Sequence, residues 1–167
     1  MSSTGLYNPE DAADSCGVGF ITRKDGQQTH EVLQLAHEAL CTVPHRGGMS
    51  AEGVGDGAGI NVDLSLAFFR KVTGLPLQAG QFGVGNFFVP KDAQLRESAE
   101  AWVAAQLAQF QLPVLFKREM PLNHQAARAA AERFQLPILQ WIFAAPADTK
   151  DQAAFERVIY QALLAIE

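Results

Sequence analysis

The sequence has little of what marks several classes of protein. It contains only two cysteines, Cys16 and Cys41, too few for the disulfide framework of a small secreted domain. No apolar run approaches the roughly 20 residues of a membrane span, and the start, MSSTGLYNPEDAAD, lacks the basic and apolar segments of a secretory signal. We therefore expect a cytoplasmic protein with no membrane partner.

Positive charge is also scarce. The chain has 13 Lys and Arg against 18 Asp and Glu, which gives a formal net charge of -5. This balance lacks the basic surface that neutralises phosphates, so we expect no nucleic-acid partner. A chain of 167 residues with 48% hydrophobic and 19% charged residues can enclose one core. We therefore expect a single globular domain, or a large part of one.

Helical and extended patterns alternate along the chain. Strands are predicted over residues 16–22, 57–62, 82–89, 113–120 and 137–145. Helices are predicted over residues 29–43, 63–72, 90–110, 123–134 and 151–167. Thr29 and Asp63 are the predicted caps of the first two helices. One apolar side of the third helix is predicted to contain Leu95, Ala99, Trp102, Val103, Leu107 and Phe110. Taken alone, this alternation favours a parallel α/β sheet.

Cys16 stands at the head of the apolar run CGVGFIT and has two interpretations. The ordinary one is a buried structural cysteine, because a free thiol packs like a small hydrophobic group. The alternative is a nucleophile, although no Lys, Arg or His is close in sequence to activate the thiol. If the Ser15-Cys16 bond were cut, the new α-amine could act as base for the thiol of the same residue. Cys41, near the end of the first helix, is predicted to be a packed core residue.

Two further segments carry chemically useful residues. In PHRGG, Arg46 is followed by glycines that let a ligand approach the backbone, and its guanidinium suits a carboxylate; a surface arginine is the alternative. The segment from Gly53 to Gly59 has glycine at every second position, but it lacks the Lys and Ser/Thr of a phosphate loop. A tight turn in which Asp56 holds backbone amides is preferred over nucleotide binding. His30 and His37 lie two helical turns apart, too far to share a metal ion without another ligand.

Read in order, CGVGF, HRGG and GDGAGI resemble the start of a class II (N-terminal nucleophile) glutamine amidotransferase domain. The resemblance is closest to the N-terminal part of the glutamate synthase large subunit. It implies that residues 1–15 are a propeptide and that residues 16–167 form the N-terminal part of the amidotransferase domain. It also implies an αββα sandwich with largely antiparallel sheets, of which this chain would hold only a part.

The resemblance also implies roles for individual residues. Cys16 matches the nucleophile, whose own α-amine moves the proton while glutamine is hydrolysed to glutamate and ammonia through a thioester. Arg46 matches the arginine that holds the α-carboxylate of glutamine, and we predict Gly48 and Asp56 as further substrate-binding residues. We expect no metal and no cofactor in this chain, since flavin and iron–sulfur sites belong to other domains of glutamate synthase.

The sequence departs from the family pattern in one chemically important respect. The oxyanion hole of the family uses an Asn-Gly pair, and this sequence has no Asn-Gly dipeptide. Loss of a single oxyanion donor costs on the order of 10²–10³ in rate. Two hypotheses remain open: a glutaminase completed by a synthase subunit or by the missing half of the domain, and a non-catalytic binding or regulatory module.

Overall fold

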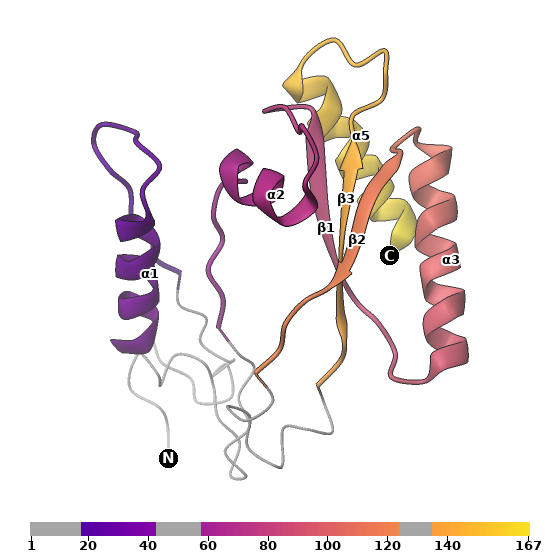
Figure 1. Ribbon diagram of the computed structural model, residues 1–167, viewed down its shortest axis with the longest axis horizontal. Coiled ribbons are helices and arrows are strands. Elements are labelled where there is room, and N and C mark those ends of the chain that lie inside the picture. Colours follow the sequence, from indigo (N-terminus) through magenta and orange to yellow (C-terminus); the bar gives the residue numbers. More distant parts are fainter. Residues whose placement is uncertain (1–17, 43–57, 124–134) are drawn as a thin grey trace, which may run out of the picture. The chain divides into compact units, whose positions relative to one another are not determined.

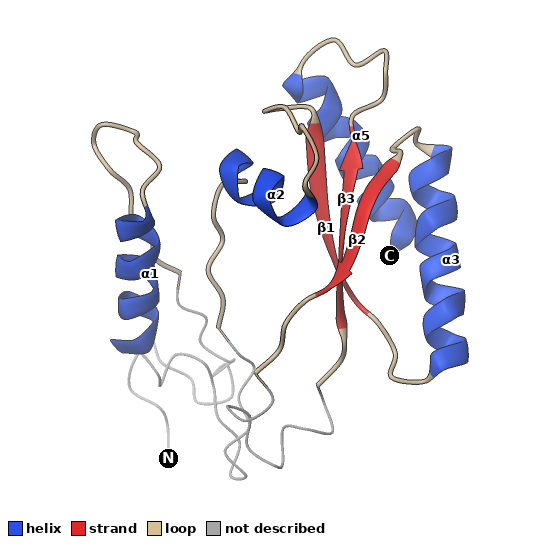
Figure 2. Cartoon of the chain, in the orientation of Figure 1, coloured by secondary structure: helices blue, strands red, loops and turns tan. Residues whose placement is uncertain are grey.

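The computed structural model describes residues 18–42, 58–123 and 135–167. The chain divides into two compact units. The first contains residues 1–63 with a short later segment, and its described element is helix α1, His30–Thr42. The second contains most of residues 64–167 and holds all the described strands (Figures 1 and 2). None of the helices in the described part of the chain is long and apolar enough to cross a bilayer.

The second unit is built on a three-stranded antiparallel sheet. Its strands are β1, Phe82–Phe88, β2, Val114–Glu119, and β3, Ile138–Ala144. β3 lies in the middle and pairs antiparallel with both neighbours, in the order β1-β3-β2. Because β1 and β2 both oppose β3, they run parallel to each other without pairing. Helix α3, Ala93–Gln109, connects them.

This topology overturns the parallel sheet that alternation alone favours. A strand, a helix and a second strand do return the chain in the original direction, as β1, α3 and β2 do here. The two strands leave a space one strand wide between them, and β3 fills it in the opposite direction. The described unit is therefore α+β with an antiparallel sheet. This agrees with the antiparallel pairing that the resemblance implies, while a second sheet is not among the described elements.

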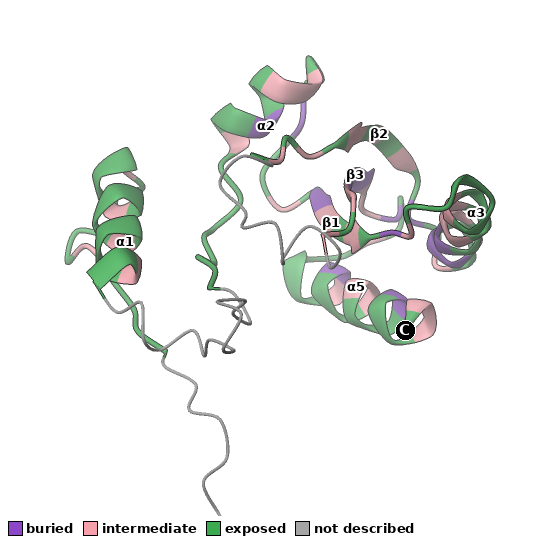
Figure 3. Cartoon of the chain, turned by 90° about the horizontal axis from the view of Figure 1, so that it is seen from below, coloured by how far each residue is buried: buried purple, intermediate pink, exposed green. Residues whose placement is uncertain are grey.

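Helices cover both faces of this sheet. α3 and α5, Gln152–Ile166, pack on one face and contact each other. α2, Leu66–Thr73, packs on the opposite face, as the view along the sheet in Figure 3 shows. The core between the sheet and the α3–α5 pair consists of Val89, Val103, Leu107, Leu112, Leu139, Trp141, Phe143, Phe155 and Ala162. The smaller core beneath α2 consists of Phe69, Leu77, Phe82 and Ile142.

Side-chain caps fix where three of the helices begin. Ser65, not the predicted Asp63, caps α2: its hydroxyl accepts a hydrogen bond from the Phe68 amide at 3.4 Å. Asp92 and Asp151 cap α3 and α5 in the same way. The predicted cap of α1 is also wrong, because the buried Thr29 hydroxyl has no hydrogen-bond partner among the described residues. Asp63 does not cap α2 because a capping residue must stand directly before the first helical turn, and α2 begins later than its apolar pattern predicts.

Three predicted strands and the last predicted helix are confirmed within a residue or two, but two predicted strands are wrong where the structure describes them. Residues 18–22 and 58–62 are not in strands. An extended apolar segment becomes a strand only when its backbone groups pair with another strand. The described sheet consists of β1, β3 and β2 alone, so neither segment is paired in it. The predicted helix over 123–134 lies almost entirely outside the described residues.

The predicted apolar side of α3 is only partly correct. Val103 and Leu107 are buried in the core, whereas Leu95 and Trp102 are exposed. Trp102 lies at the edge of the contact with α5, where its indole Nε1 donates a hydrogen bond to the Ile166 carbonyl at 3.2 Å. The helix therefore packs mainly through its second half.

Gly83 of β1 lies against the ring of Phe143, its cross-strand partner on β3. A Cβ built on Gly83 would overlap Phe143 Cε2 and would lie 2.7 Å from Cζ of the same ring. We expect Gly83→Ala to lower the free energy of unfolding by about 1–3 kcal/mol, because the ring must shift within a packed core. Chemical denaturation followed by circular dichroism measures this change.

Gly59→Ala is the control for Gly83→Ala, because a Cβ on Gly59 meets no atom within 4 Å. We expect the Gly59 variant to stay within about 0.5 kcal/mol of the unmodified protein, as exposed substitutions usually do. Equal stability of the two variants would contradict the packing of Phe143 on Gly83.

Candidate functional site

The predicted catalytic and substrate-binding residues lie outside the described part of the chain. Cys16 precedes the first described residue, and Arg46, Gly48 and Asp56 fall within residues 43–57. Their roles therefore stay predictions. The structure does describe the segments on either side of these residues, which begin at residue 18 and at residue 58.

The apolar run after Cys16 is exposed rather than packed. Val18 and Phe20 are 95% and 92% exposed, and a Cβ on Gly19 would meet no atom within 4 Å. A structural cysteine in a core strand would have neighbours that alternate between buried and exposed positions. Val18 and Phe20 would share the face of Cys16 in such a strand, and neither of them is buried. The described flank thus gives no support to the structural interpretation of Cys16.

A charged turn connects this run to α1. Arg23 Nη2 lies 2.6 Å from Asp25 Oδ2, and Arg23 Nη1 lies 3.3 Å from Glu31 Oε2 in the first turn of α1. The hydrogen bond from Arg23 lowers the pKa of Asp25 and raises the pKa of Arg23 itself. These groups are exposed, so the pairs contribute little stability. Their effect is local, because they tie the turn after the Cys16 segment to the start of α1.

Helix α1 connects the Cys16 segment to the segment that contains Arg46. None of its residues is buried; Val32, Ala36 and Leu40 on one side are half-buried, and the others are exposed. Cys41 is therefore an exposed thiol and not the predicted core residue. Its sulfur lies 3.9 Å from His37 Nε2 and 4.0 Å from Nδ1, one helical turn away. Within residues 18–42, 58–123 and 135–167, no three His, Cys, Asp or Glu side chains gather as a metal site.

The last part of the GDGAGI motif is exposed and unpaired. Ile60 and Val62 are 36% and 58% exposed, and Leu64 beyond them is 46% exposed. The turn expected around Asp56 lies outside the described residues. In the described part of this segment, the apolar side chains are not covered by a core.

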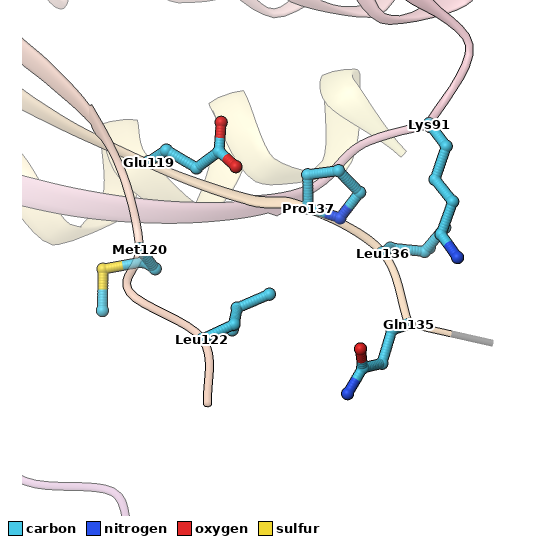
Figure 4. A pocket seen from close by; sticks show the side chains of 7 residues that line it. All are labelled: Lys91, Glu119, Met120, Leu122, Gln135, Leu136 and Pro137. Carbon is cyan, nitrogen blue, oxygen red and sulfur yellow. The ribbon is translucent and has the colours of Figure 1, made fainter. Parts of the chain in front are cut away.

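The second unit contains a pocket of about 450 Å³ near the ends of β2 and β3 (Figure 4). It is lined by Lys91, Glu119, Met120, Leu122, Gln135, Leu136 and Pro137. None of the predicted site residues contributes to it. The Glu119 carboxylate accepts a hydrogen bond from Arg96 Nη2 at 2.9 Å, which raises the pKa of Arg96. The lining of the pocket contains no cysteine, serine or threonine.

One polar network on the sheet was not predicted from the sequence. Arg118 Nε donates to Gln140 Oε1 at 2.8 Å, and Gln140 Nε2 donates to Asn86 Oδ1 at 3.0 Å. The three residues belong to β2, β3 and β1 and are paired across the sheet. A polar residue within each of two apolar strands, FGVGNFF and ILQWIFA, is the signal from which the network could have been found.

Comparison with known proteins identifies the family. The family model for class II glutamine amidotransferases matches residues 16–167, so the match begins at Cys16. The chain belongs to this family. This assignment supports amidotransferase function and agrees with the resemblance seen in CGVGF, HRGG and GDGAGI.

Curated proteins similar to this chain include several glutamate synthases. The NADPH-dependent large chain of Bacillus subtilis is 35% identical over 161 residues, covering 93% of this chain and 10% of that protein. The NADPH-dependent large chain of Azospirillum brasilense is 38% identical over 130 residues, covering 74% of this chain and 8% of that protein. The ferredoxin-dependent glutamate synthase 2 of Synechocystis is 36% identical over 138 residues, covering 80% of this chain and 9% of that protein. The chain thus spans about a tenth of the length of these relatives.

Proposed function

We propose that the chain is the N-terminal part of a glutaminase domain in which Cys16 hydrolyses glutamine to glutamate and ammonia. The observation that carries this proposal is the order of CGVGF, HRGG and GDGAGI within a chain of the class II amidotransferase family. The start of the family match at residue 16 supports the division into a propeptide, residues 1–15, and a catalytic segment.

The proposed reaction begins with removal of the propeptide. While the Ser15-Cys16 peptide bond is intact, the Cys16 nitrogen is an amide and cannot accept a proton. Cleavage converts it to an α-amine with a pKa of about 7.7–8.0. The amine takes the thiol proton as Sγ attacks the side-chain amide carbon of glutamine, and it passes that proton to the leaving nitrogen. Ammonia departs, and water then hydrolyses the thioester to release glutamate and the free thiol.

Arg46 has the proposed role of substrate anchor. The guanidinium group can donate two parallel hydrogen bonds to the α-carboxylate of glutamine, which fixes the distance between the carboxylate and the scissile amide. Gly48 lets the substrate approach the backbone beside Arg46, and Asp56 shapes the neighbouring loop. These residues select an α-amino acid and position its side chain toward Cys16.

We propose that other polypeptide completes the domain and raises its rate. No Asn-Gly pair is present to stabilise the oxyanion, so we propose that a synthase subunit or further amidotransferase segment supplies that element. We further propose that the described sheet is one layer of an αββα sandwich. The ammonia would be used by a glutamate synthase-type partner, whose flavin and iron–sulfur chemistry lies outside this chain.

A second candidate function is a non-catalytic module that keeps the substrate-side loop. The missing Asn-Gly pair favours it, because without oxyanion donors the thioester pathway is slow even when the nucleophile is present. Such a module would retain residues 1–15 and bind its ligand without turnover.

The test is the mass of the natively expressed protein, followed by labelling with a diazo-ketone analogue of glutamine. We expect loss of residues 1–15 and one covalent adduct on Cys16, located by peptide mapping. The exposed Cys41 is the internal control, since its thiol is accessible to a simple alkylating agent and is not among the proposed site residues. Glutamine should protect Cys16 and leave Cys41 unaffected.

An intact N-terminus without labelling of Cys16 would contradict the catalytic proposal and favour the non-catalytic module. Equal labelling of Cys16 and Cys41 by the glutamine analogue would show thiol reactivity without substrate recognition, and would likewise count against the proposal.

A further inference from the structure

The polar network that crosses the sheet holds Arg118 in a defined orientation. Gln140 is 5% exposed, and both ends of its side-chain amide are used. Its oxygen accepts from Arg118 Nε at 2.8 Å, and its nitrogen donates to Asn86 Oδ1 at 3.0 Å. A buried side chain with both polar ends bonded cannot rotate without losing a hydrogen bond. The plane of the Arg118 guanidinium is therefore fixed from the Nε side.

Within residues 18–42, 58–123 and 135–167, Arg118 has no counter-ion. Side chains alternate along β2, so Arg118 shares the face of Phe116, whereas Lys117 and Glu119 point to the opposite face. Lys117 lies over the Trp141 ring, and Glu119 pairs with Arg96. Arg118 Cζ lies 5.7 Å from the Phe68 ring centroid on α2. Among the residues that the structure describes, no carboxylate pairs with Arg118.

This arrangement is typical of a binding arginine. A half-buried positive charge is costly when it has no partner, and here Gln140 and Phe68 position the guanidinium without neutralising it. Nε is used by Gln140, and the described part of the chain gives the two Nη groups no hydrogen-bond partner. Their outer edge can donate two parallel hydrogen bonds to a planar anion.

We propose that Arg118, oriented by Gln140 and Asn86, is a carboxylate-binding site on the face of the sheet that α2 covers in part. A carboxylate fits better than a phosphate dianion. One guanidinium balances one negative charge, and the adjacent cation, Lys117, is held on the opposite face. The proposal is argued from residues of the second unit alone and does not rest on the glutaminase proposal.

The test is nuclear magnetic resonance of the arginine side-chain Nε–H signals in the full chain. The protein is titrated with acetate, a bare carboxylate, and with N-acetylglutamyl amide, which carries the carboxylate as a protein side chain does. We expect a saturating shift of the Arg118 signal. Backbone amide signals of the neighbouring β2 residues should follow the same binding curve and lose their saturating shift in Arg118→Gln, where the Nε–H signal itself is absent. In Gln140→Met the dissociation constant should rise about tenfold or more, since one positioned charge-assisted hydrogen bond is lost.

Arg157→Gln on the exposed side of α5 is the matched control and should bind as the unmodified protein does. Sodium chloride at equal ionic strength is a second control that needs no variant, so a folding defect in Arg118→Gln leaves the proposal testable. Tighter binding of N-acetylglutamyl amide than of acetate would identify a polypeptide side chain as the source of the carboxylate. Equal binding would identify a free carboxylate. A linear, unsaturated response, or one that chloride reproduces, would overturn the proposal.

Discussion

Replacing Cys16 by alanine is expected to reduce ammonia release from glutamine to the background measured without protein. The proposed thioester needs the sulfur as nucleophile, and the α-amine of alanine has no thiol proton to accept. Loss of the nucleophile in a hydrolase whose groups act as a unit costs on the order of 10⁶ in kcat. For this chain we expect the rate of ammonia release to fall about 10³-fold or more, because the missing Asn-Gly pair already lowers the rate of the unmodified protein. Glutamate formation under saturating glutamine measures it.

Cys41→Ala is the matched control for this prediction. Cys41 is the other cysteine of the chain, and its thiol is exposed on α1. We expect that variant to keep the rate of the unmodified protein. Activity that depends on an α-amine should also rise with pH through about 7.7–8.0, because only the neutral amine accepts the thiol proton. Equal ammonia release by Cys16→Ala and the unmodified protein would refute the enzyme hypothesis.

Replacing Trp141 by alanine is expected to cost about 3–5 kcal/mol of the free energy of unfolding. Trp141 is 1% exposed at the centre of β3, the middle strand. Its ring packs edge-on against Phe87, with centroids 5.5 Å apart, and Lys117 Nζ lies 3.4 Å from its centroid. Removing the indole leaves a cavity in the core beside β1 and β2, the two neighbours of β3. Denaturation followed by far-ultraviolet circular dichroism measures the change without depending on tryptophan fluorescence.

Trp102→Ala provides the comparison within the same chain. Trp102 is 54% exposed and makes one hydrogen bond, to the Ile166 carbonyl. Loss of this hydrogen bond in Trp102→Ala is expected to lower the free energy of unfolding by about 0.5–1.5 kcal/mol. Trp141→Phe, which keeps a ring in the core, should fall between the two alanine variants and covers the case in which Trp141→Ala does not fold. Similar losses for the two alanine variants would contradict the central position of Trp141.

Much of the second unit could be predicted because its elements carry strong local patterns. The strand around FGVGNFF, the helix before Phe110 and the strand ILQWIFA all appear where periodicity places them. Strand direction could not be predicted from alternation. The order of helices and strands is the same whether β3 extends a parallel sheet or fills the space between β1 and β2.

Predictions failed where the outcome depends on partners distant in sequence. Residues 18–22 and 58–62 have extended apolar patterns, yet neither is a strand, since strand formation requires pairing. The Arg118–Gln140–Asn86 network illustrates the reverse case. Arg118 and Gln140 are ordinary polar residues in the sequence, and only the register of β2 against β3 brings them together.

For this protein, the sequence alone determined the family and the proposed nucleophile, because CGVGF, HRGG and GDGAGI are local motifs whose residue types and order carry the information. Tertiary structure decided which way the strands run and that Cys41 is exposed. It also decided that a buried Gln140 orients Arg118. The physical reason is that pairing direction, burial and the meeting of polar side chains depend on contacts between distant residues, and no local pattern specifies those contacts.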